Sequence, residues 1–218
     1  MYLICAFLLV TIVFESQIAS GRHKDMKSFM VYEVVSDVIS NPPQNLLRVM
    51  YPSGVEVAEG KELKVDDVIG YPVLTWNAEE DEFYTVMLVD PDYPSRREPY
   101  ARSFVHWLKM NVVLDDVTTG DTVADLIFTK PDPGTGIHRY VYLVYKQPAK
   151  ISSLHDNAPN STTEGRKFFN PNKFASKYNL GQPVAGNFYR TRNKGRIRIY
   201  NFFDPAIVGA RTDLTSND

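Results

Sequence analysis

The stretch VMLVDPDYPSR, residues Val86–Arg96, joins an apolar run to two aspartates and two prolines. The four apolar residues that open it predict a buried β-strand. Pro91 and Pro94 then stop the strand, because proline has no N–H to give to a sheet ladder. Asp90 thus stands at the end of a strand whose burial fixes its position, and the sequence predicts a functional site there.

The second aspartate of the stretch is predicted to play a different part. Asp92 is assigned to turn chemistry, either by capping backbone amides or by pairing with Arg96. The Tyr93–Pro94 bond is a candidate for the cis form, which roughly 5–6 % of X-Pro bonds adopt and which favours tight turns. Of the two carboxylates, only Asp90 is therefore predicted to act at the site.

Segments of β type continue on both sides of this strand. Pro, Gly and Asn separate them, which is typical of an antiparallel β domain with few helices. The predicted strands cover residues 46–51, 55–57, 73–76, 83–89, 104–113 and 140–146. The fold class expected from this pattern is mostly β with flanking helices.

Two segments have helical patterns. Apolar residues recur at helical spacing over Phe29–Ile39, and an Asn-Pro-Pro sequence ends the run. A second helix is predicted to begin after Asn170, a good capping residue, with Pro171 in its first position and Gly181 beyond its end. The segment 194–203 fits either a strand or a terminal helix.

The chain of 218 residues is long enough for one large domain, and no polar low-complexity linker divides it. We expect a signal peptide over residues 1–20, an N-terminal arm over 21–28, one domain over 29–208 and a flexible tail over 209–218. The 24 basic and 26 acidic residues nearly balance. Nucleic-acid binding needs a clustered basic surface, so no nucleic-acid partner is expected.

The N-terminal apolar run, Tyr2–Phe14, predicts export. It is shorter than the roughly 20 apolar residues of a spanning helix and small residues follow it, as in a secretory signal peptide. No Lys or Arg precedes the run, and an uncleaved membrane anchor is the alternative. The single cysteine, Cys5, lies in this segment, so a secreted mature protein would have no disulfide. Asn160 begins an Asn-Ser-Thr sequon and is a predicted glycosylation site, which fits an extracellular protein.

Two histidines begin apolar stripes on predicted strands, because alternate side chains of a strand share a face. One stripe runs through His106, Leu108, Met110 and Val112, and the other through His138, Tyr140, Tyr142 and Val144. Each histidine is therefore expected where a buried face reaches the rim of the sheet. Asp90 has the same kind of position on its own strand.

Several kinds of site could use two histidines and a carboxylate. A facial triad for iron has these ligands, but no His-x-Asp spacing supports it, and a serine hydrolase would need a Gly-x-Ser-x-Gly sequence that is absent. A phosphate pocket needs only donors around a small cavity, and the turn 134–136 (Gly-Thr-Gly) could bring backbone N–H groups to an anion. Plain hydrogen bonding at the sheet rim is the structural alternative.

The sequences LVDPDYPSR, VHWLKMNV and GTGIHRYVYLVYKQ together resemble the paired signature of the phosphatidylethanolamine-binding proteins, also called Raf kinase inhibitor proteins. The likeness extends over about residues 35–189. It implies a single domain with a large antiparallel sheet, a smaller sheet and flanking helices. It also implies a small pocket that accepts phosphate, acetate-like anions or a phosphoethanolamine headgroup.

The resemblance also implies which residues form this pocket. Its core would consist of Asp90, His106 and His138, its wall of Pro94, Pro131 and Tyr140, and Tyr200 would close it from the C-terminal segment.

The sequence departs from the family pattern at three places. Tyr93 would narrow the mouth, and Lys130 would add positive charge beside an anion. Ala101, Ser103 and Val105 replace aromatic and polar residues before His106, and Tyr100 would supply the missing ring.

We therefore expect a secreted, monomeric and non-catalytic binding protein that needs no cofactor or metal. Its partner would be phosphate or a phospholipid headgroup. The alternative is an inhibitor that acts through protein interaction, with a protease or a signalling protein as its partner. An enzyme, either a metal-dependent oxygenase or a phosphohydrolase, is the third class.

Overall fold

The computed structural model describes residues 26–153 and 159–195 of the chain. The predicted signal peptide, Tyr200 and the predicted tail lie outside these residues and stay predictions. Within the described residues, no helix is long and apolar enough to cross a membrane.

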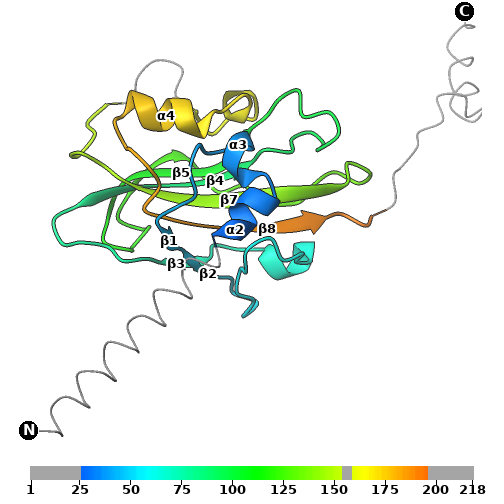
Figure 1. Cartoon of the computed structure of the whole chain (residues 1–218). Helices are drawn as coiled ribbons and strands as arrows, with labels where there is room; N and C mark the ends of the chain where they lie inside the picture. Colours follow the sequence, from blue (N-terminus) through cyan, green and yellow to red (C-terminus); the bar gives the residue numbers. More distant parts are fainter. Residues whose placement is uncertain (1–25, 154–158, 196–218) are drawn as a thin grey trace, which may run out of the picture.

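A six-stranded sheet in the order β1-β8-β7-β4-β5-β6 forms the centre of the molecule, and β2 and β3 form a separate two-stranded sheet (Figure 1). The strands are β1 Asn45–Leu46, β2 Arg48–Met50, β3 Val73–Thr75, β4 Phe83–Asp90, β5 Phe104–Val113, β6 Asp121–Ala124, β7 Ile137–Lys146 and β8 Ala185–Arg192. The large sheet is antiparallel except at one edge, where β1 pairs with β8 in parallel. The predicted fold class is confirmed, with a mixed rather than a wholly antiparallel sheet.

The helices are short: α2 Lys27–Val31, α3 Val34–Asp37 and α4 Pro171–Lys177, with the 3-10 turns η1 Val65–Val68 and η2 Glu164–Arg166. The prediction for α4 is confirmed, because the Asn170 side chain accepts a hydrogen bond from the N–H of Lys173 (2.9 Å) and Pro171 opens the helix.

The single helix predicted over residues 29–39 is wrong in its continuity. Glu33 (φ 57°) has a left-handed backbone conformation and separates α2 from α3, and Ser36 (φ 99°) interrupts α3 itself. A side chain distant in the sequence, that of Arg139, contacts the chain at this break. The guanidinium of Arg139 donates to the carbonyl of Tyr32 (2.7 Å) and to the carboxylate of Asp37 (2.6 Å), so the chain bends around this arginine.

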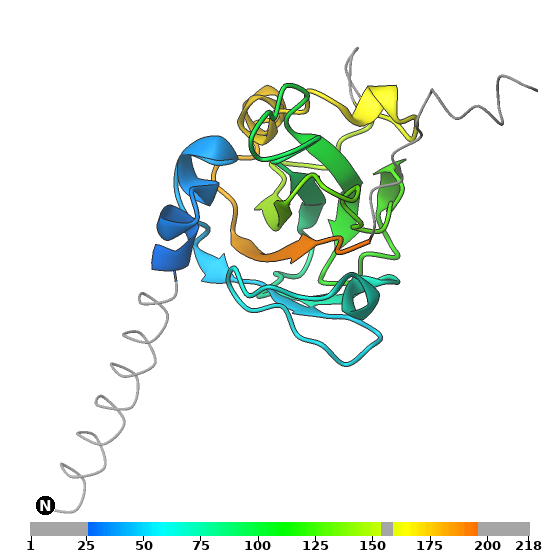
Figure 2. The same cartoon turned by 90° about the vertical axis from the view of Figure 1, so that its right-hand side faces the viewer.

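Two hydrophobic cores lie on opposite faces of the large sheet. Alternation along β4 and β7 divides their side chains between the two, as the period of a strand requires. Met87, Val89, Val141 and Leu143 pack with residues of α2, α3 and α4, such as Phe29, Val34 and Phe174. Val86, Leu88, Tyr142 and Val144 pack with residues of the small sheet, such as Val49 and Leu74. Accordingly, α4 and the small sheet lie on opposite sides of the large sheet (Figure 2).

Two strands were not predicted, and one predicted strand is absent. β8 was missed because its buried face includes a polar residue, Asn187, which donates to the carbonyls of Leu47 (2.8 Å) and Val57 (3.1 Å). β6 was missed because half of its four residues are exposed. The segment 55–57 forms only an isolated bridge at Glu56.

Candidate functional site

Three strand ends meet at one edge of the large sheet. β4 runs antiparallel to both β5 and β7, so its C-terminal end lies beside the starts of its two neighbours. This topology brings Asp90 of β4 next to His106 of β5 and His138 of β7.

Between these ends lies a cavity of about 230 Å³, which we call the strand-end pocket. It is lined by Asp90, Tyr93, Pro94, Phe104, His106, Ile127, Phe128, Lys130, Pro131, Asp132, His138, Tyr140 and Thr163. All the site residues predicted within the described chain are therefore brought together.

Asp90 and His138 form a buried pair. Asp90 Oδ2 lies 2.7 Å from His138 Nδ1, and both side chains are 2 % exposed. The other imidazole nitrogen, Nε2, lies 3.0 Å from the Thr135 hydroxyl, which already donates its proton to the carbonyl of Asp132 (2.8 Å). Both ring nitrogens thus have a side-chain partner, which fixes the orientation of the imidazole.

The turn that contains Thr135 was expected to offer backbone N–H groups to an anion. Gly134 (φ 87°) and Gly136 (φ 91°) do have left-handed conformations, as such a turn requires. However, the N–H of Thr135 donates to the carbonyl of Asp132 (3.3 Å). The turn therefore serves the pocket through the Thr135 hydroxyl, which positions His138.

His106 is placed by a β-bulge. Leu88 pairs with Trp107 and Val89 with Val105, so His106 is the extra residue of β5. The bulge makes the predicted stripe through His106 wrong. Leu108 and Met110 pack on the side of the helices. The ring of His106 instead lies against Tyr140, with 5.2 Å between centroids, on the side of the small sheet.

His106 differs chemically from His138. Its Nδ1 lies 2.9 Å from the carbonyl of Ile127, so this nitrogen carries the proton. Burial lowers the pKa of His106, an effect that the nearby Asp90 carboxylate only partly opposes. At neutral pH the ring is therefore uncharged and Nε2 is an acceptor. Nε2 becomes a donor only when the ring takes up a proton, either because a bound anion raises the pKa of His106 or because the pH is lower.

Tyr140 lies between the two histidines. Its ring stacks on that of His138 with 6.4 Å between centroids and an interplanar angle of 18°. Burial, and then the negative charge of Asp90, raises the pKa of Tyr140 well above its usual value of 10. The phenol therefore keeps its proton and is a neutral donor.

Asp92 has a larger part than predicted. It is fully buried and accepts from the Arg139 backbone N–H (2.9 Å), Nε (2.9 Å) and Nη2 (2.7 Å). The predicted contact with Arg96 is present but longer, at 3.6 Å. The turn itself is capped by Asp90, whose Oδ1 accepts from the N–H of Asp92 (2.8 Å). The predicted cis bond between Tyr93 and Pro94 is present.

The aromatic wall of the pocket was predicted only in part. Tyr93 lines it as expected and contacts Phe104, with 4.8 Å between ring centroids. Tyr100 does not line it and is 77 % exposed. Phe104 supplies the ring instead, and its position two residues before His106 was the signal that could have identified it. Ile127 and Phe128 come from an irregular segment that carried no such signal.

A buried cation lies behind His106. Arg166 of η2 is 1 % exposed, and its Nη1 donates to the carbonyls of Val105 (3.1 Å) and His106 (2.9 Å). Within the described residues it forms no ion pair with a carboxylate. Its charge is one of the causes that lower the pKa of His106, after burial.

Among the described residues, no group of three or more His, Cys, Asp or Glu side chains is arranged to hold a metal ion. Asp90, His106 and His138 thus converge on a cavity without forming a facial triad. The strand-end pocket instead presents two carboxylates, two imidazoles, two phenols and an exposed lysine around a small space. This set can hold a ligand that carries both charges.

Comparison with known proteins assigns the family. Residues 53–189 match the phosphatidylethanolamine-binding protein family. The chain belongs to this family. The resemblance expected from the sequence signature is thereby confirmed.

Two relatives are similar to this chain over most of its length. The chain is 36 % identical to odorant-binding protein A5 of Drosophila melanogaster over 160 residues, 73 % of this chain and 76 % of that protein. It is also 36 % identical over 165 residues to the 26 kDa secreted antigen of Toxocara canis, covering 75 % of this chain but only 63 % of that protein.

Among solved structures, carboxypeptidase Y inhibitor, determined in complex with its cognate proteinase, has the same fold. The TM-score is 0.69 at 25 % identity, over 79 % of this chain and 97 % of the inhibitor. Relatives of the chain thus include proteins named for ligand binding, for secretion and for protease inhibition.

Proposed function

We propose that this protein is a non-catalytic binding protein whose strand-end pocket binds phosphate or a phosphoethanolamine-type headgroup. The observation that carries the proposal is the buried Asp90–His138 pair, with His106 and Tyr140 beside it around one small cavity. The cavity volume of about 230 Å³ suits a headgroup rather than a whole lipid.

Each side chain has a distinct role in this proposal. Tyr140 donates its hydroxyl to a phosphate oxygen, and Lys130 adds charge at the exposed rim. His106 is uncharged without a ligand; a bound phosphate would raise its pKa, and the imidazole, after taking up a proton from solvent, would donate from Nε2 to a phosphate oxygen. Asp90 holds His138 and contributes the negative charge that a zwitterionic headgroup would meet.

Secretion is part of the proposal. The N-terminal apolar run reads as a signal peptide, and one relative is named a secreted antigen. Asn160, the proposed glycosylation site, is exposed, as an acceptor must be. The test is to recover the protein from the medium of cells that express it and to compare its mass before and after deglycosylation. Its presence in the medium tests export, and a fall in mass tests modification of Asn160.

The direct test is calorimetric titration of the protein with glycerophosphoethanolamine, a soluble headgroup. Binding should be saturable, and Asp90→Ala and His138→Ala should each weaken it at least tenfold. Lys64→Gln, a change of an exposed lysine away from the pocket, is the matched control and should bind normally. Unchanged affinity in both pocket variants, with folded spectra, would refute the assignment of the site.

A second candidate function is inhibition of a protease or another protein, supported by the likeness to carboxypeptidase Y inhibitor. It is tested by adding the protein to carboxypeptidase Y with and without saturating glycerophosphoethanolamine. Inhibition that persists with a filled pocket would favour this function. No inhibition in either condition would remove the support that this likeness gives it.

The non-catalytic part of the proposal has a separate test. Elemental analysis of the purified protein should find less than one iron or zinc ion per chain. Stoichiometric metal that remains after dialysis would favour the enzyme class instead.

A further inference from the structure

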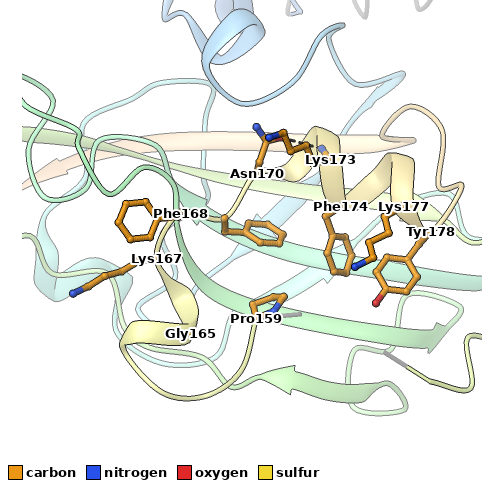
Figure 3. Close-up of a pocket in the computed structure, with 10 residues that line it drawn as sticks. Pro159, Gly165, Lys167, Phe168, Asn170, Lys173, Phe174, Lys177 and Tyr178 are labelled. Carbon is orange, nitrogen blue, oxygen red and sulfur yellow. Dashed lines mark hydrogen bonds between the residues drawn. The ribbon is translucent and has the colours of Figure 1, made fainter. Parts of the chain in front are cut away.

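A second cavity, of about 200 Å³, lies beside α4 and shares no lining residue with the strand-end pocket (Figure 3). We call it the α4 cavity. It is bounded by the helix on one side and by residues 165–170 on the other. The turn η2 separates the two cavities, because Thr163 before it lines the strand-end pocket and Lys167 after it lines the α4 cavity.

Aromatic rings form the wall of the α4 cavity. Phe174 lies between Phe169 and Tyr178, with ring-centroid distances of 5.4 and 4.7 Å. These three rings are largely buried. Rings held at such distances form a rigid apolar surface on which a flat apolar group can pack.

Phe168 continues this aromatic wall at the protein surface and has an uncommon backbone conformation. Its side chain is 68 % exposed, and its backbone has a left-handed conformation (φ 59°) that bulky residues rarely adopt. Its N–H donates to the carbonyl of Ala101 (3.2 Å), which helps to hold it there. A large apolar side chain that is fixed in an uncommon conformation and left exposed points to a role in binding.

The charged residues around the α4 cavity are all cations. Lys167, Lys173 and Lys177 line it, and no aspartate or glutamate does so among the described residues. Lys167 pairs with Glu164 (2.7 Å), just outside the lining. Figure 3 shows Lys173 beside Asn170 near the start of α4 and Lys177 beside Tyr178 near its end. The cavity thus joins an apolar wall to a positive rim.

We propose that the α4 cavity binds a small carboxylate with an aromatic or short aliphatic body. The body would pack on the rings of Phe168 and Phe174, and the carboxylate would meet Lys173 near the start of the helix. The volume supports this size, because cavities of about 150 Å³ hold a benzene molecule and about 200 Å³ leaves room for a carboxylate as well. This site is independent of the proposed function of the strand-end pocket.

The test is an NMR titration of the ¹⁵N-labelled protein with sodium benzoate and, separately, with benzyl alcohol. Benzoate should shift the amide signals of residues 168–178 saturably. Benzyl alcohol has the same ring without the charge and should bind at least tenfold more weakly. A non-saturable response, or equal affinity for the two compounds, would overturn the proposal.

Variants separate the ring wall from Lys173. Lys173→Gln should weaken benzoate binding at least fivefold, whereas Lys64→Gln should leave it unchanged. Phe168→Gly suits the left-handed backbone, so the fold should survive while benzoate binding is lost, and Phe168→Trp should retain binding. Benzoate binding that survives Phe168→Gly would refute the role of the ring.

A final control distinguishes the two cavities. Asp90→Ala should leave the benzoate shifts at residues 168–178 intact. If Asp90→Ala abolishes them, the ligand is in the strand-end pocket, and the α4 cavity proposal fails while the headgroup proposal does not.

Discussion

The two histidines of the strand-end pocket are held in opposite ways. His138 begins a regular strand, pairs with Asp90 and is followed by Arg139, which pairs with Asp92 and Asp37. The buried carboxylates of this wall, Asp90 and Asp92, each have a side-chain partner. His106 sits on a bulge, bonds to a backbone carbonyl, and has a buried arginine behind it that bonds to carbonyls alone.

This difference indicates where a ligand's negative charge belongs. On the His138 wall, the positive charge of Arg139 is already neutralised by Asp92 and Asp37, so this wall offers no unpaired guanidinium to a phosphate. The His106 wall combines an uncharged imidazole with a cation, Arg166, that has no carboxylate partner among the described residues. An anion bound there would supply the missing charge, and this balance makes the His106 wall the phosphate side of the proposed site.

The largest effect is expected on the neutralised wall. Asp92→Ala leaves the guanidinium of Arg139 buried without its bidentate partner, so the free energy of unfolding should fall by about 3–5 kcal/mol. Urea denaturation followed by tryptophan fluorescence measures it. The control is Glu62→Ala, which breaks an exposed pair with Arg192 and should cost no more than about 1 kcal/mol. Similar losses in the two variants would contradict the contrast between the walls.

The ion pairs of this wall show what the sequence could not predict. The apolar run of β4 and the alternating stripe of β7 correctly gave both strands and the convergence of Asp90 with His138. Asp92 and Arg139 are 47 positions apart, and no local pattern links them. Asp92 was therefore assigned to the turn, although the fold uses it as the partner of a buried arginine.

On the other wall, strand periodicity itself was misleading. The period of two placed His106 on one face with Leu108 and Met110, but a bulge in β5 turns it to the other face. A bulge depends on pairing with the neighbouring strand, so it leaves little trace in a single strand's sequence. The family signature implied a pocket position for His106, and the structure does place it in the lining of the strand-end pocket, whereas periodicity predicted its neighbours wrongly.

The next effect tests the cation of the His106 wall. Arg166→Met removes a positive charge and three hydrogen bonds to carbonyls, so glycerophosphoethanolamine should bind about tenfold more weakly. Because the charge of Arg166 lowers the pKa of His106, its loss should raise that pKa, as NMR titration of the imidazole would show. Arg166→Lys keeps the charge and should preserve more of the affinity. A pKa of His106 that stays fixed in Arg166→Met would mean that the arginine has only a structural role.

A smaller effect concerns stability at acidic pH. The folded pKa of His106 lies below its unfolded value of about 6.5, so the unfolded chain binds the extra proton first. The contribution of His106 to the free energy of unfolding is fully present above pH 6.5. It is lost as the pH falls through the pKa that His106 has in the folded protein. The slope is at most about 1.4 kcal/mol per pH unit, the limit for one proton.

Urea denaturation of the protein and of His106→Asn between pH 7.5 and 5 measures this contribution. The variant should show a flatter dependence of stability on pH than the unchanged protein. Parallel curves would show that His106 does not titrate differently in the two states.

The smallest effect separates the rim of the pocket from its interior. Lys130 is exposed, so water and salt screen its charge, and Lys130→Gln should weaken glycerophosphoethanolamine binding only about two- to fivefold. The loss should shrink further in 0.5 M salt, whereas the loss in Arg166→Met should persist because that charge is buried. If Lys130→Gln costs more affinity than Arg166→Met, the phosphate lies at the rim and the contrast between the two walls does not determine where the ligand binds.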